Sequence, residues 1–248
     1  MTNIIMLCRG RLRLSEQALN SLFANTDQDT YTLTVVSDAE DDFRITKMLR
    51  SIQRKNFTLL EVSGSTHVLS QLKNLGVAWS EQRFGRGDWL YLSDNDVWFS
   101  PGWLEKLTQF AADSEPHSYR LWGGQIHPYH QPIGRDLDYG EYLGTEHQIL
   151  DGPSWLMRWQ TWDLCGPLQR TTAPGVCQSE ETPFCQALTT RGIVTTNKRR
   201  NGETASPARI GVIRPFVVEH TGITQTDGKL APGAEERMKN AVPGVLYL

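Results

Sequence analysis

The sequence predicts an α/β fold in which helices flank a mostly parallel central sheet. Three features predict it. Short apolar segments alternate with amphipathic helical segments through the first hundred residues. These apolar segments resemble strands that are buried on both faces of a sheet. Two of them end abruptly in acidic residues, at Asp38 and at Asp94-Asn95-Asp96. In sheets of this class, ligands bind beyond the carboxyl ends of the strands.

The first half of the chain supplies the alternation. Leu14, Ala18, Leu19 and Leu22 have the spacing of one helix face, and Ser15 has the chemistry of its cap. Segment 31–36 is β-branched, as is typical of a strand. By the same reasoning we expect strands at residues 3–8, 31–36, 57–62 and 89–92, and helices at 15–24, 43–54 and 67–81. This order predicts a sheet of the nucleotide-binding type.

The second half is less regular. Segment 114–152 is rich in Gly, Pro, His and Tyr, which indicates short strands and loops over one face of the site. We expect further strands at 155–159 and 210–220, and helices at 161–165 and 182–191. The tail, residues 221–248, is interpreted as a lid or a packed arm. A chain of 248 residues without a linker predicts one domain.

Composition excludes several classes of protein. The 25 basic and 28 acidic residues nearly balance, so the overall charge favours neither a polyanion nor a membrane surface as partner. The four cysteines form no Cys-x-x-Cys pair, which predicts reduced thiols. The apolar run at residues 4–7 is too short for a signal peptide or a membrane span. We therefore expect a cytoplasmic protein with no transmembrane segment.

The acidic pair Asp94 and Asp96 follows the apolar segment Trp89-Leu-Tyr-Leu92 directly. Hard cations such as Mg²⁺ and Mn²⁺ prefer carboxylate oxygens, and Mg²⁺ sites typically combine one or two carboxylates with substrate phosphates. The pair therefore predicts a site for Mn²⁺ or Mg²⁺ on a nucleoside diphosphate. The alternative is an ordinary turn in which Asp and Asn side chains bond to the backbone.

Four motifs in the first half belong together: the opening Ile4-Ile-Met-Leu-Cys-Arg-Gly-Arg-Leu, the segment Val35-Val-Ser-Asp38, the segment Leu72-Lys-Asn74-Leu-Gly and the segment Gly87-Asp-Trp-Leu-Tyr-Leu-Ser-Asp94-Asn-Asp96. In order and spacing they resemble glycosyltransferases of the GT-A fold, in particular the family 2 group, and the resemblance covers most of the chain. The resemblance implies that Asp38 contacts the nucleoside. It also implies that Asn74, Asp94 and Asp96 hold the sugar nucleotide and its metal. The chain departs from the family at Ser37, where the family usually has Asp.

The second half resembles the acceptor half of the same family. Ser179-Glu180-Glu181-Thr opens a predicted helix where the family has Glu-Asp, whose Asp is the general base of inverting members. The resemblance thus implies Glu181 as the catalytic base, with Glu180 as the competing candidate. It also implies that His220 completes the metal shell and that Gly152 and Trp155 lie near the acceptor. The single domain then divides into a nucleotide-sugar half (1–110), an acceptor half (111–220) and the tail.

Other residues allow further interpretations. Arg9, Arg11 and Arg13 can bind a diphosphate or an anionic acceptor, nucleic acid included. Trp122 is a weaker candidate than Trp155 for stacking on a sugar. His127 and His130 have the spacing of a metal pair, but a solvated loop explains them better.

The sequence as a whole predicts a metal-dependent glycosyltransferase that transfers a sugar, with inversion, from a nucleotide sugar of the UDP class to an acceptor hydroxyl. Two alternatives stay open. One is a nucleotidyltransferase of the same fold, because Arg9-Gly-Arg-Leu-Arg13 faintly resembles the Gly- and Arg-rich first loop of that group. The other is a non-catalytic protein that binds a nucleotide sugar. The sequence identifies neither the acceptor, whether saccharide, small molecule or nucleic acid, nor the oligomeric state.

Overall fold

A central mixed sheet organises the computed structural model, which describes residues 1–38, 43–63, 69–124, 136–139, 142–147, 150, 154–169, 181–191, 193–195, 205–214 and 217–220. Within these ranges the sheet has nine strands in the order β3-β2-β1-β4-β9-β6-β12-β8-β7. All of them run in one direction except β9 and β8, so the sheet is mostly parallel, as predicted. The strands are β1 (Thr2–Cys8), β2 (Tyr31–Asp38), β3 (Phe57–Val62), β4 (Trp89–Asp94), β6 (Tyr119–Gly123), β7 (Asp136–Tyr139), β8 (Tyr142–His147), β9 (Ser154–Met157) and β12 (Arg209–Arg214).

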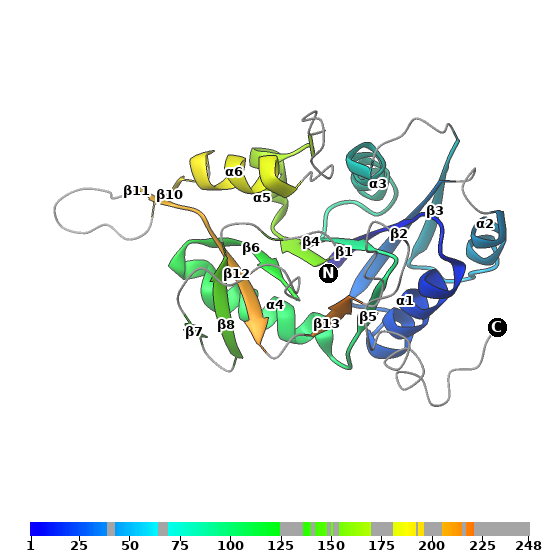
Figure 1. Cartoon of the computed structure of the whole chain (residues 1–248), viewed down its shortest axis with the longest axis horizontal. Coiled ribbons are helices and arrows are strands. Elements are labelled where there is room, and N and C mark those ends of the chain that lie inside the picture. Colours follow the sequence, from blue (N-terminus) through cyan, green and yellow to red (C-terminus); the bar gives the residue numbers. More distant parts are fainter. Residues whose placement is uncertain are drawn as a thin grey trace, which may run out of the picture.

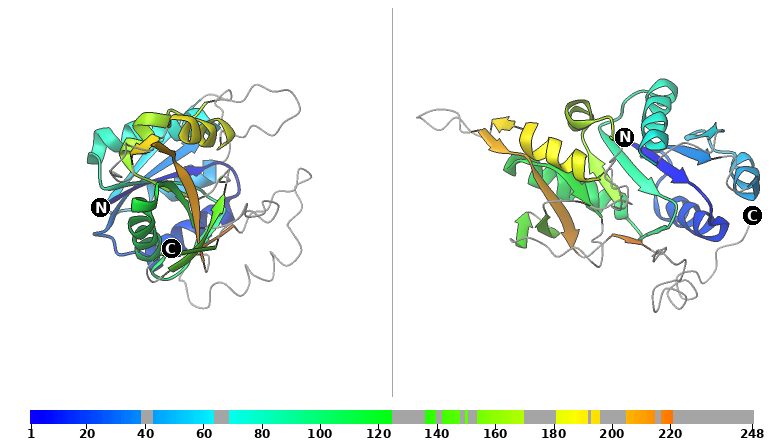
Figure 2. Two further views of the ribbon diagram at one scale, coloured as in Figure 1. Left: turned by 90° about the vertical axis from the view of Figure 1, so that its left-hand side faces the viewer. Right: turned by 45° about the horizontal axis from the view of Figure 1, so that its top comes forward.

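Helices cover both faces of this sheet (Figure 1). One face packs against α1, α2 and α4, and the other packs against α3, α5 and α6. Figure 2 shows the same two layers from two further directions. The helices are α1 (Leu12–Asn25), α2 (Phe43–Arg50), α3 (Leu69–Phe84), α4 (Trp103–Ser114), the short 3₁₀ helix η1 (Glu115–His117), α5 (Trp159–Cys165) and α6 (Glu181–Arg191).

Alternation along the strands assigns each apolar residue to one of the two layers. In β1, Ile4 and Met6 belong to the core with α1, whereas Ile5 and Leu7 belong to the core with α3. All four side chains are at most 3% exposed. Successive side chains of a strand point to opposite faces, so a strand covered on both sides has to be apolar throughout. This explains the uninterrupted apolar segments of the sequence.

The close approach of α3 to the sheet depends on a glycine. A Cβ atom on Gly76 would lie 2.6 Å from Ile5 Cγ2 and 2.6 Å from Val36 Cγ2, which is too close for any side chain. Because Gly76 lacks a Cβ, the helix can settle directly on β1 and β2. One turn earlier on the same helix, Lys73 is buried against the sheet, and its side chain reaches the end of β4.

The predicted elements of the first half are confirmed, with shifted ends. The helix expected from Ser15 begins three residues earlier, at Leu12, and its N-cap is Arg11 in the left-handed conformation. Ser15 does not cap the helix; its hydroxyl lies inside the first turn and donates to the Arg11 carbonyl (3.3 Å). The helix expected to run to residue 54 ends at Arg50. In the second half, the strand expected at 155–159 is β9, which ends at Met157 before α5 begins.

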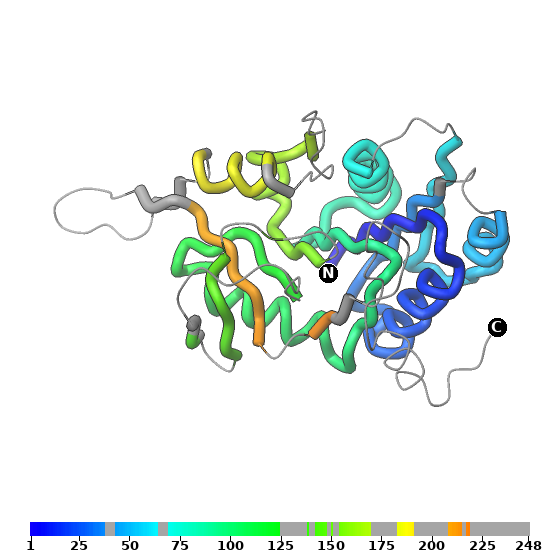
Figure 3. The backbone as a smooth tube through the Cα atoms, viewed as in Figure 1, coloured from blue at the N-terminus to red at the C-terminus, as the bar shows by residue number. Residues whose placement is uncertain are grey.

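The strand predicted at 210–220 is in fact two strands that belong to different sheets. β12 lies in the central sheet, whereas β13 (Val218–His220) pairs antiparallel with β5 (Val97–Phe99). Figure 1 labels β13 beside β5, although the two are far apart in the sequence, and Figure 3 traces the same backbone as a tube. The change of sheet is fixed by Gly124, whose carbonyl accepts hydrogen bonds from the backbone N–H groups of Val217 and Val218.

The structure also contains elements that the sequence analysis did not predict, α4 and β5 among them. β10 (Ile193–Thr195) and β11 (Ala205–Pro207) form a separate two-stranded sheet. The predicted lid or arm at 221–248 lies outside the described residues. In the part of the chain that the structure describes, no helix combines the length and the apolar character that crossing a membrane requires.

Candidate functional site

The carboxyl ends of β2, β1 and β4 lie next to one another at one edge of the sheet. Cys8, the last residue of β1, pairs with Ser37 of β2, and Leu7 pairs with Asp94, the last residue of β4. Asp38 ends β2 one residue beyond Ser37. The parallel register thus brings the two acidic motifs of the sequence to the same edge, separated only by β1.

The loop between β1 and α1 crosses this edge. Gly10 and Arg11 both have φ near 58°, in the left-handed region. Glycine adopts this conformation readily, whereas an ordinary residue there costs of order 1 kcal/mol and needs support from its surroundings. Asn95 supplies support, because its amide nitrogen donates to the Gly10 carbonyl (3.1 Å) and to the Ser15 hydroxyl (2.7 Å). The middle residue of Asp94-Asn95-Asp96 therefore fastens the loop beside the two acids.

Both carboxylates of the acidic pair contact basic side chains. A guanidinium nitrogen of Arg11 lies 2.7 Å from Asp96 Oδ2, and Lys73 Nζ lies 3.2 Å from Asp94 Oδ1. The side chains of Asp96 and Asp94 are 10% and 29% exposed, and that of Lys73 is only 5% exposed. A charged group rarely stays this buried unless it is paired, so the pairing explains how Lys73 is tolerated. Two basic side chains thus hold the acidic pair at this edge of the sheet.

Sequence reasoning missed Lys73, and it treated Arg11 only as one of three basic residues. The missing information was the register of α3 and of the loop, which decides which lysine or arginine reaches the strand ends. A weak signal was available for each residue. Lys73 lies between Leu72 and Asn74 on a helix that packs on the sheet, where an isolated charge needs a partner. Arg11 follows a glycine directly after a strand, a common place for a side chain that faces a site.

The buried groups beside the site do not ionise at neutral pH. Burial raises the pKa of the Cys8 thiol to about 12; a hydrogen bond with Ser15 lowers it less than burial raises it, and the Asp94 charge raises it further. Burial also raises the pKa of Tyr91, whose hydroxyl contacts Ser154 Oγ at 2.8 Å. Cys8 therefore does not offer a thiolate nucleophile or a thiolate ligand at this edge. The chemistry here belongs to carboxylates and cations.

The backbone brings His220 near the acidic pair. In the pairing of β13 with β5, His220 lies opposite Val97, the residue that follows Asp96. The side chain of His220 is not among those described. Among the described residues, no group of three His, Cys, Asp or Glu side chains could hold a metal ion. The described part of the site therefore offers two carboxylates as hard ligands.

Asn74 and Trp155, for which the resemblance implies binding roles, both make side-chain contacts within the protein. The Asn74 amide is bonded at both ends to the Leu168 backbone, donating to its carbonyl (2.9 Å) and accepting from its N–H (2.9 Å). Trp155 is 2% exposed, donates to the Leu150 carbonyl and packs on Phe184 at 5.2 Å between ring centres. These contacts hold both side chains in place, and the binding roles of the two residues stay predictions.

Trp122, the weaker stacking candidate, is also a core residue. It is fully buried, and its indole nitrogen donates to Ser114 Oγ (2.7 Å). A buried ring cannot stack on a sugar without displacing the core around it.

The remaining predicted residues are placed by the backbone alone or lie outside the described ranges. Arg9 follows β1 at the edge and is partly buried. Glu181 is the first residue of α6, as expected of a residue that opens a helix. The first turn of α6 also lines a cavity of about 320 Å³ between α5 and α6. Glu180, Gly152 and the pair His127 and His130 lie outside the described residues.

Solved structures that are similar to the chain include TarS from S. aureus. The chain superposes on TarS residues 1–349 with a TM-score of 0.55 at 13% identity, covering 88% of this chain and 59% of that one. The same fragment in complex with UDP-GlcNAc gives a TM-score of 0.53 at 14% identity, with 91% and 61% covered. No family model matches the sequence. No curated protein matches it either.

The chain has the GT-A type of nucleotide-binding fold. The likeness to TarS, together with the mostly parallel sheet and its two helix layers, establishes this fold. The identity is too low to establish more than the fold. The chain also spans only about three fifths of the TarS fragment.

Proposed function

We propose that the chain is a glycosyltransferase that transfers a sugar from a nucleotide sugar to an acceptor hydroxyl. The observation that carries the proposal is the acidic pair Asp94 and Asp96 at the carboxyl edge of a GT-A sheet, beside the loop that follows β1. A binding site is expected at this edge in such a sheet. A protein of the same fold has been solved with UDP-GlcNAc, which supports a UDP-sugar as the donor. Membership of the family 2 group is part of the proposal, on the motifs quoted above.

The residues present fit a divalent cation bound together with a diphosphate. Asp94 and Asp96 supply the one or two carboxylates that a Mg²⁺ or Mn²⁺ site uses, and the diphosphate oxygens supply further hard ligands. In the pairing of β13 with β5, His220 lies opposite Val97, the residue after Asp96, which supports His220 as a third protein ligand. When bound, the cation would neutralise the charge that develops on the diphosphate leaving group.

The chain's own residues would carry the other parts of the reaction. Asp38, at the end of β2, would contact the nucleoside, and Arg9 and Arg11 would face the diphosphate. Glu181, at the start of α6, would accept the proton of the acceptor hydroxyl as its oxygen attacks the anomeric carbon. Attack from the face opposite the leaving diphosphate inverts that carbon, so a base on the acceptor side predicts inversion.

The first test is the release of UDP from a panel of UDP-sugars in the presence of Mn²⁺ and simple saccharides, with the same assay on Glu181→Gln. We expect the wild-type protein to release UDP from one donor. We expect Glu181→Gln to lower the rate by roughly 10²- to 10⁴-fold, the usual contribution of a general base. Glu105→Gln, a change at an exposed site on α4, is the matched control and should leave the rate unchanged.

Two results would contradict this proposal in different ways. Release of pyrophosphate from a nucleoside triphosphate, with no turnover of sugar nucleotides, would identify a nucleotidyltransferase. Binding of a UDP-sugar without turnover in either protein would identify a non-catalytic binding protein. Full activity of Glu181→Gln would remove Glu181 from its role but would keep the transfer reaction.

A further inference from the structure

The ion pair between Arg11 and Asp96 occupies a carboxylate that the proposed metal needs. The Arg11 guanidinium lies 2.7 Å from Asp96 Oδ2, within hydrogen-bond distance. A divalent cation on the same oxygen would place two positive charges within a few ångströms of each other. Such charges repel strongly in a partly buried site, because screening by water is weak there. Metal and guanidinium therefore compete for this oxygen.

Of the two basic side chains at the site, that of Arg11 is the one that can move. Its side chain is 36% exposed and extends from a loop, whereas the Lys73 side chain is 5% exposed on a helix packed against the sheet. Moving Lys73 would require part of the core to open. Moving Arg11 requires only rotation of a side chain whose outer part already faces solvent. Lys73 thus acts as a fixed partner of Asp94, and Arg11 as an exchangeable partner of Asp96.

We propose that the Arg11 side chain is an ion-pair latch on Asp96. A divalent cation displaces the Arg11 guanidinium from Asp96, and the guanidinium then pairs with the diphosphate of the donor. This inference rests on the proposed function of the same site. A guanidinium pairs well with phosphate oxygens because its N–H groups form a planar fork. The diphosphate also completes the coordination of the cation. The cation therefore releases Arg11 for the diphosphate, and the diphosphate keeps Arg11 away from Asp96, so metal and donor bind cooperatively.

The latch predicts a specific pattern of affinities. In the protein without nucleotide, the cation has to break the Arg11 ion pair without compensation, so its binding is weak. With UDP present, Arg11 gains a new partner, so the affinity for the cation rises. Linkage requires that the cation strengthen UDP binding by the same factor, and such couplings typically amount to about 5- to 150-fold. Removal of the Arg11 side chain should therefore tighten metal binding without UDP and reduce the coupling.

The test is a direct titration of the full chain with Mn²⁺, with free Mn²⁺ followed by electron paramagnetic resonance, in the absence and presence of UDP. The variants are Arg11→Gln and Arg11→Gly, the latter chosen because glycine adopts the observed φ of 58° without strain. We expect both variants to bind Mn²⁺ about tenfold more tightly than wild type when UDP is absent, within the usual range of such couplings. We also expect UDP to improve Mn²⁺ binding by a smaller factor in the variants than in wild type.

Arg83→Gln is the matched control, since it removes the same charge from an exposed position in the last turn of α3, to which no role in binding is assigned. It should change the Mn²⁺ affinity less than twofold if the effect depends on the ion pair rather than on net charge. Equal or weaker Mn²⁺ binding in the Arg11 variants, with UDP-dependent Mn²⁺ binding intact in wild type, would overturn the latch and leave the proposed function standing. Absence of Mn²⁺ binding in every protein, even with UDP, would overturn both the latch and metal-dependent transfer.

Discussion

Asp96→Asn is expected to lower kcat/KM for UDP-sugar turnover roughly 10³-fold, which corresponds to about 4 kcal/mol of lost transition-state stabilisation. Asparagine has the shape of aspartate, so the partly buried side chain can keep its place. It lacks the negative charge, however, and therefore holds neither a divalent cation nor the Arg11 guanidinium firmly. The measurement is steady-state UDP release by purified wild-type and Asp96→Asn proteins at saturating Mn²⁺.

Asp113→Asn provides the control for this change. Asp113 is on α4, where its carboxylate accepts a hydrogen bond from Gln109 (2.9 Å). Its substitution removes one carboxylate from the same protein without touching the strand edge, and turnover should stay within twofold of wild type. Normal turnover by Asp96→Asn would show that the acidic pair is an ordinary structural turn.

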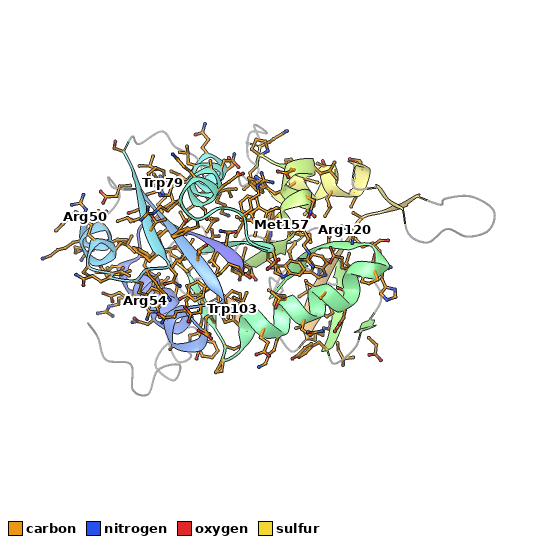
Figure 4. The ribbon with its side chains drawn as sticks, turned by 180° about the vertical axis from the view of Figure 1, so that it is seen from behind. Arg50, Arg54, Trp79, Trp103, Arg120 and Met157 are labelled. Atoms are coloured by element: carbon orange, nitrogen blue, oxygen red, sulfur yellow. The ribbon has the colours of Figure 1, made fainter. Side chains whose placement is uncertain are left out.

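Trp103→Ala is expected to lower the free energy of unfolding by about 3 to 5 kcal/mol, the usual cost of deleting a buried aromatic ring. Trp103 is fully buried. It lies at the start of α4, as Figure 4 shows from behind. Its ring packs on Tyr91 and Phe99, with ring centres 4.8 and 4.6 Å away, and its indole nitrogen donates to Thr26 Oγ1 (2.8 Å). These contacts join α4 and α1 to the two strands that flank the acidic pair. The measurement is urea unfolding followed by circular dichroism.

Two substitutions separate the contributions of this side chain. Trp103→Phe keeps most of the apolar area and loses the hydrogen bond to Thr26, so it should cost about 1 to 2 kcal/mol. Trp79→Ala removes the same ring from α3, where the residue is 37% exposed and donates to Thr58 Oγ1 of β3 (3.2 Å); it should cost less than Trp103→Ala. Equal losses for Trp79→Ala and Trp103→Ala would contradict the packing described here.

Local patterns predicted the strands and helices of the first half because each is encoded by its own residues. The uninterrupted apolar segments of β1 and β4 reflect burial on both faces, which the sequence shows directly. The division of segment 210–220 between β12 and β13 could not be predicted in this way. It depends on a hydrogen-bonded tie to Gly124, almost a hundred residues earlier, and on β5 as a partner.

The candidate site shows the same division between local and long-range information. Asp94 and Asp96 stood out because an abrupt change of polarity after a strand is a local signal. The contacts of Asn74 and Trp155 could not be predicted locally, because their partners, the Leu168 backbone and Phe184, lie far away in the sequence. Lys73 was missed for the same reason, since only the packing of α3 shows that it reaches Asp94.

The most direct test of the account is the thermal stability of the wild-type protein with a panel of nucleoside diphosphates, each with and without Mn²⁺. A ligand at a hundredfold excess over its Kd stabilises a protein by about 2.7 kcal/mol, or roughly 5 to 10 °C for a chain of this size. We predict that UDP raises the melting temperature by this amount with Mn²⁺ and by much less without it. A melting temperature that none of the diphosphates changes, with or without Mn²⁺, would contradict a nucleotide-sugar site at the edge formed by β1, β2 and β4.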